Sequence, residues 1–233
     1  MKVNSLFLVA TLALTAANLS AASGRQDSIE RLSLASDTLT AMINTPDKGI
    51  PEEVLSNAKC IVVIPHLVKG GFVVGGEHGR GVATCRTAEG WSAQAFVSLG
   101  GGSWGLQIGV EGVDLVMVVM NDNGLQHMLS SKFKIGADAS ASAGPVGRHA
   151  SAGTDWKMDS EILTYSRSKG VFAGISLDGA VVEQDVDSTR AIYGHNTSLR
   201  STLNGKVEAP QSTREFLRVV KQTAHTSAVA EAK

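Results

Sequence analysis

A serine among glycines, Gly101-Gly102-Ser103-Trp104-Gly105, is the first feature of this sequence that could do chemistry. It has the G-x-S-x-G form with which hydrolases present a nucleophilic serine, on a sharp turn that leads from a strand into a helix. Here Leu106, Ile108 and Val110 alternate with smaller or polar residues, which predicts a strand after the serine. Because the required helix is missing from this pattern, we expect no catalytic residue and no enzyme activity here.

Two other clusters could hold a ligand. Residues 75–81 read Gly-Gly-Glu-His-Gly-Arg-Gly, but no Lys-Ser or Lys-Thr pair follows, as a phosphate loop requires, and no helix opens after the glycines. His66, Glu77 and His78 match no paired spacing of metal ligands. The glycines are better explained by tight turns and close strand approach. We therefore expect neither a cofactor nor a metal.

Cys60 and Cys85 are the only cysteines, and the sequence leaves their state open. In an oxidising compartment they could form a disulfide that stabilises the fold by roughly 3 kcal/mol. If residues 60–64, 71–75 and 82–86 form a simple meander, however, the outer two strands lie about 9.5 Å apart, too far for a bridge. The alternative is a pair of small buried hydrophobic side chains.

The N-terminus predicts export. Lys2 precedes an apolar run over residues 6–17, and Ser20-Ala21-Ala22 supplies the small residues that a signal peptidase reads. We expect residues 1–22 to be a signal peptide and the mature chain to begin at Ser23, in a periplasmic or extracellular setting. An uncleaved N-terminal membrane anchor is the alternative, although the run is short for a bilayer.

The remaining chain suits one domain over residues 23–225, followed by a frayed tail over 226–233. The apolar residues of this domain have helical spacing near the N-terminus, then form short β-branched runs separated by glycine, and return to helical spacing after Pro210. The expected fold is α+β: a glycine-rich, mainly antiparallel β core, sandwich-like or barrel-like, bracketed by N-terminal and C-terminal helices. The expected helices cover residues 26–43, a short segment from Pro51, 122–130, 187–193 and a segment from Pro210; the expected strands cover residues 60–64, 71–75, 81–85, 91–99, 104–110, 113–120, 162–167, 171–177 and 180–185. Residues 136–153, rich in Gly, Ala and Ser, fit either a closely packed strand or a linker.

Several motifs, in order, resemble the SYLF domain family over roughly residues 27–222. They lie at residues 58–65, 71–81, 101–109, 114–121, 136–139, 165–174, 191–194 and 203–207. The resemblance implies a lipid-binding module and not an enzyme. Eukaryotic members of this family bind phosphoinositides and membranes, fungal members bind and bundle actin, and bacterial members look like secreted or envelope proteins.

For an exported chain, the resemblance implies binding to anionic phospholipid or a membrane surface of the bacterial envelope. Family members contact membranes through an N-terminal amphipathic helix, which corresponds here to about Gln26–Ile43. That helix could equally cover the β core, because its polar face mixes both charges. The candidate lipid-binding residues are Arg25, Arg31, Lys132, Phe133, Lys134, Arg214, Arg218 and Lys221.

Two other functions compete with this one. An interaction or structural module for another envelope protein is the first alternative, and a serine hydrolase built on Ser103 is the second. The formal net charge of −1 does not indicate a nucleic-acid partner.

Overall fold

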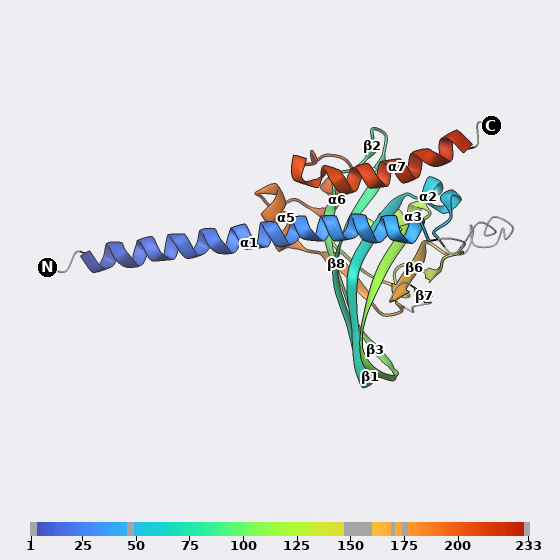
Figure 1. Ribbon diagram of the computed structural model, residues 1–233, viewed down its shortest axis with the longest axis horizontal. Helices are drawn as coiled ribbons and strands as arrows, with labels where there is room; N and C mark the ends of the chain where they lie inside the picture. Colours follow the sequence, from blue (N-terminus) through green and yellow to red (C-terminus); the bar gives the residue numbers. More distant parts are fainter. Residues whose placement is uncertain (1–3, 46–48, 147–159, 169–170, 174–176, 231–233) are drawn as a thin grey trace.

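The fold is a curled β-sheet covered by helices, in agreement with the predicted α+β class (Figure 1). The computed structural model describes residues 4–45, 49–146, 160–168, 171–173 and 177–230. Side chains are described over residues 23–45, 49–70, 75–102, 111–146, 160–168 and 177–223. Among the described residues, no helix combines the length and the apolar character needed to cross a membrane.

Helix α1 (Asn4–Ile43) is a single helix of 40 residues that runs through the predicted signal-peptide boundary (Figure 1). The alanine-rich and leucine-rich start favours helix, and no proline interrupts the chain before Pro46. Leu32, Ala35, Leu39 and Met42 recur at helical spacing and are buried. The amphipathic face predicted for residues 26–43 therefore packs against the protein's own core.

Strands β1 (Cys60–Thr87) and β3 (Ala95–Val119) form one long antiparallel ribbon that bends back on itself. Its register shifts between Ile64 and Leu67 and again between Gly71 and Val73. The ribbon extends to a tip far from the helices and returns, so the two limbs of β1 lie side by side (Figure 1). A Cβ on Gly81 would lie 2.2 Å from the Val63 carbonyl oxygen, so glycine permits this approach.

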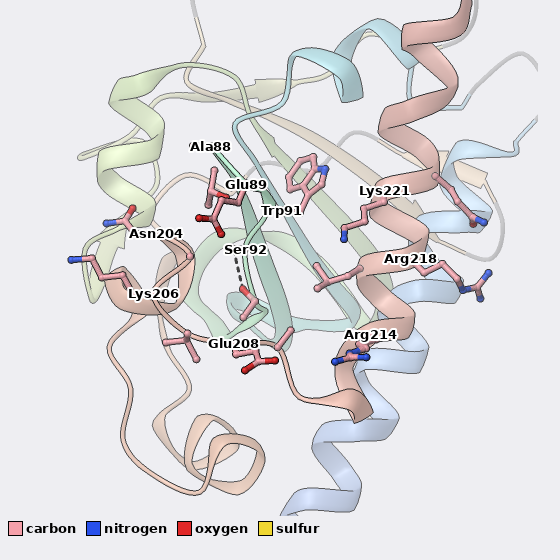
Figure 2. Close-up of a pocket in the computed structure, with 17 residues that line it drawn as sticks. Ala88, Glu89, Trp91, Ser92, Asn204, Lys206, Glu208, Arg214, Arg218 and Lys221 are labelled. Atoms are coloured by element: carbon pink, nitrogen blue, oxygen red, sulfur yellow. Dashed lines mark hydrogen bonds between the residues drawn. The ribbon is translucent and has the colours of Figure 1, made fainter.

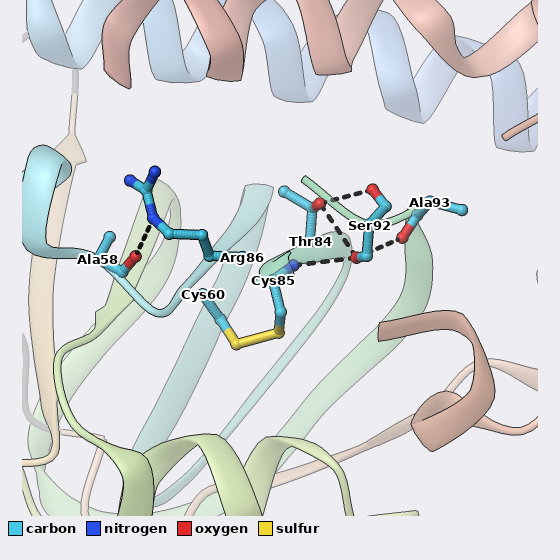
Figure 3. The surroundings of a disulfide bond; sticks show 7 residues. All are labelled: Ala58, Cys60, Thr84, Cys85, Arg86, Ser92 and Ala93. Carbon is cyan, nitrogen blue, oxygen red and sulfur yellow. Dashed lines mark hydrogen bonds between the residues drawn. A yellow bond between two sulfur atoms is a disulfide. The ribbon is translucent and has the colours of Figure 1, made fainter. Parts of the chain in front are cut away.

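The doubling of β1 corrects the expected meander and decides the cysteine question. Residues 60–64, 71–75 and 81–85 are parts of one strand, and its two ends meet instead of lying two strand spacings apart. The Arg86 N–H donates to the Lys59 carbonyl at 2.7 Å, and Cys60 and Cys85 form a disulfide with their Cα atoms 4.0 Å apart (Figure 3). Farther along, Lys69 Nζ lies 2.9 Å from Glu77 Oε2 in a largely buried ion pair between the limbs.

Alternate residues of the ribbon face two hydrophobic clusters. Val62 and Ile64 lie in the cluster inside the curl, while Ile61 and Val63 face helices α1 and α7. This period of two is the one expected for strands buried on both faces. The sheet is therefore a rigid layer with helices on its outer face.

The other elements complete the sheet and its cover. The helices are α2 (Glu52–Asn57), α3 (Asp122–Met128), α5 (Val186–Tyr193), α6 (Leu199–Leu203), the 3-10 turn η2 (Gln211–Thr213) and α7 (Arg214–Ala230). The strands are β2 (Gly90–Trp91), β4 (Lys132–Lys134), β5 (Ala141–Ala143), β6 (Ile162–Ser168), β7 (Val171–Ala173) and β8 (Val181–Gln184). Strands β5 and β6 form a parallel pair, whereas the other strand pairs in the described part of the sheet are antiparallel.

Several predicted boundaries can be compared with these elements. Helix α5 begins after the capping residue Asp185 and ends at Gly194 (φ 77°), close to the predicted span. Of the ambiguous stretch 136–153, residues 141–143 are strand and residues 147–153 lie outside the described part of the chain. Helix α6 and strand β4 were not predicted.

Candidate anion-binding groove

The arginines of α1 point toward α5. Arg31 Nη1 donates to Asp185 Oδ2 at 3.1 Å and to Ser188 Oγ at 2.9 Å, and the side chains of Arg31 and Asp185 are only 11% and 7% exposed. Arg25 Nη1 donates to the carbonyl oxygens of Ala191 and Ile192, at the last turn of α5. The two arginines thus hold α1 against both ends of α5, and the largely buried guanidinium of Arg31 is not available to a lipid in this arrangement.

Asp185 is the centre of this contact. It caps α5 by accepting from the Ser188 N–H at 3.0 Å and from Ser188 Oγ at 2.7 Å, and Arg80 Nε lies 3.9 Å away. Burial works against ionisation of this carboxyl, but the hydrogen bonds from Ser188 and the charges of Arg31 and Arg80 outweigh it, so its pKa lies below the ordinary value. Burial also lowers the pKa of Arg31, partly offset by Asp185.

The predicted patch at residues 132–134 is divided between two faces of β4. Phe133 is 3% exposed and lies in the core inside the curl, so it cannot enter a bilayer. Lys132 and Lys134 are exposed, and Lys132 Nζ lies 3.2 Å from Glu183 Oε2 on the paired strand β8. The structure therefore provides two surface lysines here, without the aromatic side chain.

The predicted cations of α7 lie along a groove. Its walls are α7, the turn between β1 and β2, and the segment 204–209 after α6, and its volume is about 1040 Å³ (Figure 2). The charged residues that line it are Glu89, Lys206, Glu208, Arg214, Arg218 and Lys221. Because Arg218 pairs with Glu215, three other cations and two carboxylates remain, a positive formal excess of one.

The three α7 cations take different directions. Figure 2 shows Arg214 and Lys221 reaching from α7 toward the groove, whereas Arg218 extends to the other side of the helix. Arg218 Nη2 lies 3.8 Å from Glu215 Oε1 in an exposed pair. Arg214 and Lys221 make no ion pair or side-chain hydrogen bond with the residues that the structure describes, and both are exposed.

Trp91 and Leu217 supply an apolar surface to the groove. Trp91 is half-buried, and the Arg86 guanidinium carbon lies 4.7 Å from its ring centroid. Arg86 is itself fixed, since Nε donates to the Ala58 carbonyl at 3.2 Å and Nη2 to that of Ser56 at 3.1 Å (Figure 3 shows the first of these bonds). The disulfide at Cys85 precedes this turn directly, so the Trp91 wall starts from a covalently fixed point.

Sequence reasoning missed part of this groove. Neither Trp91 nor Lys206 is among the candidate lipid-binding residues that the sequence indicates. The Asn204-Gly205 pair is a turn signal, and Gly205 has φ 76°. It could have indicated an exposed turn carrying Lys206, but not that this turn lies opposite α7.

The other candidate chemistry stays unsupported. Ser103 lies within β3, paired with Gly75, so its backbone does not form the strand-to-helix turn of a hydrolase. Of the possible metal ligands, His66 and His78 are exposed and Glu77 pairs with Lys69. Within the described ranges, no three His, Cys, Asp or Glu side chains are placed to share a metal ion.

Comparison with known proteins identifies the relatives of this chain. The family model described as Ysc84, Las17-binding protein actin regulator, matches residues 100–223. Protein YSC84 of Saccharomyces cerevisiae is 32% identical over 182 residues, covering 76% of this chain and 39% of that protein. The SH3 domain-containing protein PJ696.02 of Schizosaccharomyces pombe is 34% identical over 175 residues, covering 73% and 40% respectively.

A mammalian relative has a similar match. The SH3 domain-containing YSC84-like protein 1 of Rattus norvegicus is 29% identical over 179 residues, covering 76% of this chain and 52% of that protein. The chain thus spans about two fifths to one half of the length of these relatives. The region that the family model matches includes β3 from Gly100 onward, the segment 204–209 and the described cations of α7. The chain belongs to the Ysc84 family, whose shared domain is the SYLF domain.

Proposed function

We propose that this protein is a non-catalytic module that binds anionic phospholipid at a membrane surface of the bacterial envelope. The observation that carries the proposal is the groove between α7, the β1–β2 turn and the segment 204–209. Arg214 and Lys221 face it without a carboxylate partner among the described residues, and Trp91 and Leu217 lie beside them. Cations next to apolar side chains match a lipid, whose phosphate adjoins its hydrocarbon.

Export supports the envelope setting. Lys2, the apolar run over residues 6–17 and Ser20-Ala21-Ala22 have the order of a secretory signal. The bond between Cys60 and Cys85 also suits an oxidising compartment, where disulfides form and persist. A protein of the bacterial envelope would meet anionic phospholipid on the membrane surfaces around it.

A protein partner is the second candidate, because relatives carry the names Las17-binding protein actin regulator and LAS seventeen-binding protein 3. Those relatives are more than twice as long as the matched region, so their binding activity belongs to larger proteins. For this chain, the same groove would then receive an acidic segment of another envelope protein. Vesicle binding separates the two candidates.

The test is co-sedimentation of the mature chain with vesicles. We expect binding to vesicles of phosphatidylcholine with phosphatidylglycerol, weak binding to phosphatidylcholine alone, and a decrease as salt rises. Each cation near the surface contributes about 1 kcal/mol, so Arg214→Gln with Lys221→Gln should weaken binding about thirtyfold.

The matched control is Lys132→Gln with Lys134→Gln, which removes the same charge from the exposed face of β4. This pair should retain most of the binding, and both double variants should unfold at the wild-type urea concentration. Equal sedimentation of the wild type with neutral and anionic vesicles would refute the proposal. An equal loss of vesicle binding in both double variants would show that the groove is not the binding site.

A further inference from the structure

Along α7, the groove presents a cation, an apolar side chain and a second cation in succession. Arg214, Leu217 and Lys221 are spaced three and four residues apart, so they share one face of the helix. All three line the groove, and Figure 2 shows Arg214 and Lys221 reaching into it from different levels of α7. Leu217 is 8% exposed, so its side chain is packed into the wall of the groove.

The distance between the two cations sets the kind of anion that can use both. Seven residues of α-helix separate their Cα atoms by about 10 Å along the axis. Figure 2 shows the two side chains entering the groove at different levels, so in this arrangement a single phosphate at the Arg214 guanidinium leaves Lys221 without a partner, and the reverse holds as well. Two phosphates joined by a short neutral linker, which lies over Leu217 and opposite Trp91, engage both.

We propose that the groove selects a phospholipid with two phosphates on a neutral bridge, as in diphosphatidylglycerol (cardiolipin), over lipids with one phosphate. This inference rests on the proposed function and names the ligand of the same site. Arg214 and Lys221 both face the groove without an acidic partner among the described residues, which favours a ligand with more than one negative charge. Its apolar wall of Trp91 and Leu217 favours a lipid over a free diphosphate.

A ligand that engages both cations makes their contributions depend on each other. When one phosphate is bound, the second is held at a high effective concentration beside the other cation. The loss of either cation then abolishes the advantage of the joined phosphates. With single-phosphate lipids, by contrast, Arg214 and Lys221 act independently and their losses add.

The experiment compares two vesicle sets of equal formal surface charge in phosphatidylcholine. One contains cardiolipin, and the other contains twice the mole fraction of phosphatidylglycerol. We expect the wild type to bind the cardiolipin set about tenfold more tightly. Arg214→Gln and Lys221→Gln should each reduce this ratio to near one, while both still bind phosphatidylglycerol vesicles measurably. Lys132→Gln and Lys134→Gln, as matched charge removals, should leave the ratio unchanged.

The outcomes separate this inference from the proposed function. A wild-type ratio of one overturns the two-phosphate selectivity and leaves anionic phospholipid binding in place. Binding to neither set defeats the proposed function itself. A ratio that persists in both single groove variants overturns the assignment to this groove. At equal ionic strength, inorganic pyrophosphate should displace no more protein from cardiolipin vesicles than sulfate does. Greater displacement by pyrophosphate would overturn the assignment to a lipid.

Discussion

Helices α1 and α7 pack on the same face of the sheet, and each carries cations. On α1, Arg31 is largely buried against Asp185, and Arg25 binds carbonyl groups at the end of α5. On α7, Arg214 and Lys221 face a groove and have no acidic partner among the described residues. The first pair of side chains stabilises the protein, while the second remains available to an external anion.

The difference lies in what the fold places opposite each helix. Helix α5 presents its capping carboxylate and its last carbonyl groups to α1, and both need a donor or a cation. The segment 204–209 and the β1–β2 region present the Trp91 ring, Lys206 and the carboxylates of Glu89 and Glu208 to α7, and neither carboxylate pairs with Arg214 or Lys221 among the described residues. Exposed cations are therefore informative about ligands only after the partners within the fold are known.

Among the variants that test this difference between α1 and α7, Arg31→Ala should have the largest effect on stability. It leaves the Asp185 carboxylate, 7% exposed, without its closest cation, so we expect a loss of about 2–3 kcal/mol in the free energy of unfolding. Urea denaturation measures this loss. Vesicle binding per folded molecule should stay close to that of the wild type.

Arg31→Lys is the matched control for that change. It keeps the charge but replaces the planar guanidinium, whose Nη1 donates to both Asp185 and Ser188, with a more strongly hydrated ammonium, so it should recover only part of the stability. If Arg31→Ala leaves the unfolding curve unchanged and weakens vesicle binding, then α1 belongs with α7 as a binding helix and the comparison fails.

A smaller effect is expected from acid, because only the ionised form of Asp185 pairs with Arg31. The pKa of Asp185 is lowered in the folded protein, despite the opposing effect of burial. Ionisation therefore adds stability that is complete above the ordinary carboxyl pKa of about 4, declines below that value, and is lost as the pH falls through the lowered pKa of the folded protein. Urea unfolding between pH 6 and about pH 3 should show a steeper fall in stability for the wild type than for Asp185→Asn.

Asparagine is a suitable comparison because it also caps a helix N-terminus, so the cap of α5 is retained and only the titrating charge is lost. Arg31 and Arg80 are the cations that face this carboxyl. Parallel pH curves for the two proteins would show that Asp185 contributes no pH-dependent stability, and the structural role assigned to Arg31 would lose its electrostatic basis.

Local features of the fold could be read from the sequence. The helical spacing of Leu32, Ala35 and Leu39 identified the buried face of α1, and Asp185 and Gly194 marked the ends of α5. Even the burial of Phe133 had a signal, because the alternation Lys-Phe-Lys is that of a strand with one buried face. The patch was misread because Phe133 was grouped with the lysines on either side of it instead of being assigned to the opposite face of a strand.

Long-range contacts could not be read in this way. Arg31 and Asp185 are separated by 154 positions, and nothing in a helical pattern specifies such a partner. The doubling of β1 depends on which backbone Gly79 and Gly81 approach, and a glycine in a sequence does not name its neighbour. The disulfide and the groove both follow from that doubling, which is why the sequence left the first open and missed part of the second.

The smallest effect concerns Arg25, whose side chain is exposed and binds carbonyl groups at the end of α5. A cation at a helix C-terminus contributes about 0.5 kcal/mol, so Arg25→Ala should barely move the urea midpoint. Hydrogen exchange should reveal the loss as faster exchange confined to the last turn of α5. Because the sequence also indicates Arg25 as a lipid contact, vesicle binding decides between the two roles. A several-fold loss of vesicle binding, with unchanged hydrogen exchange in α5, would give α1 a part in binding. Unchanged vesicle binding leaves that role to α7.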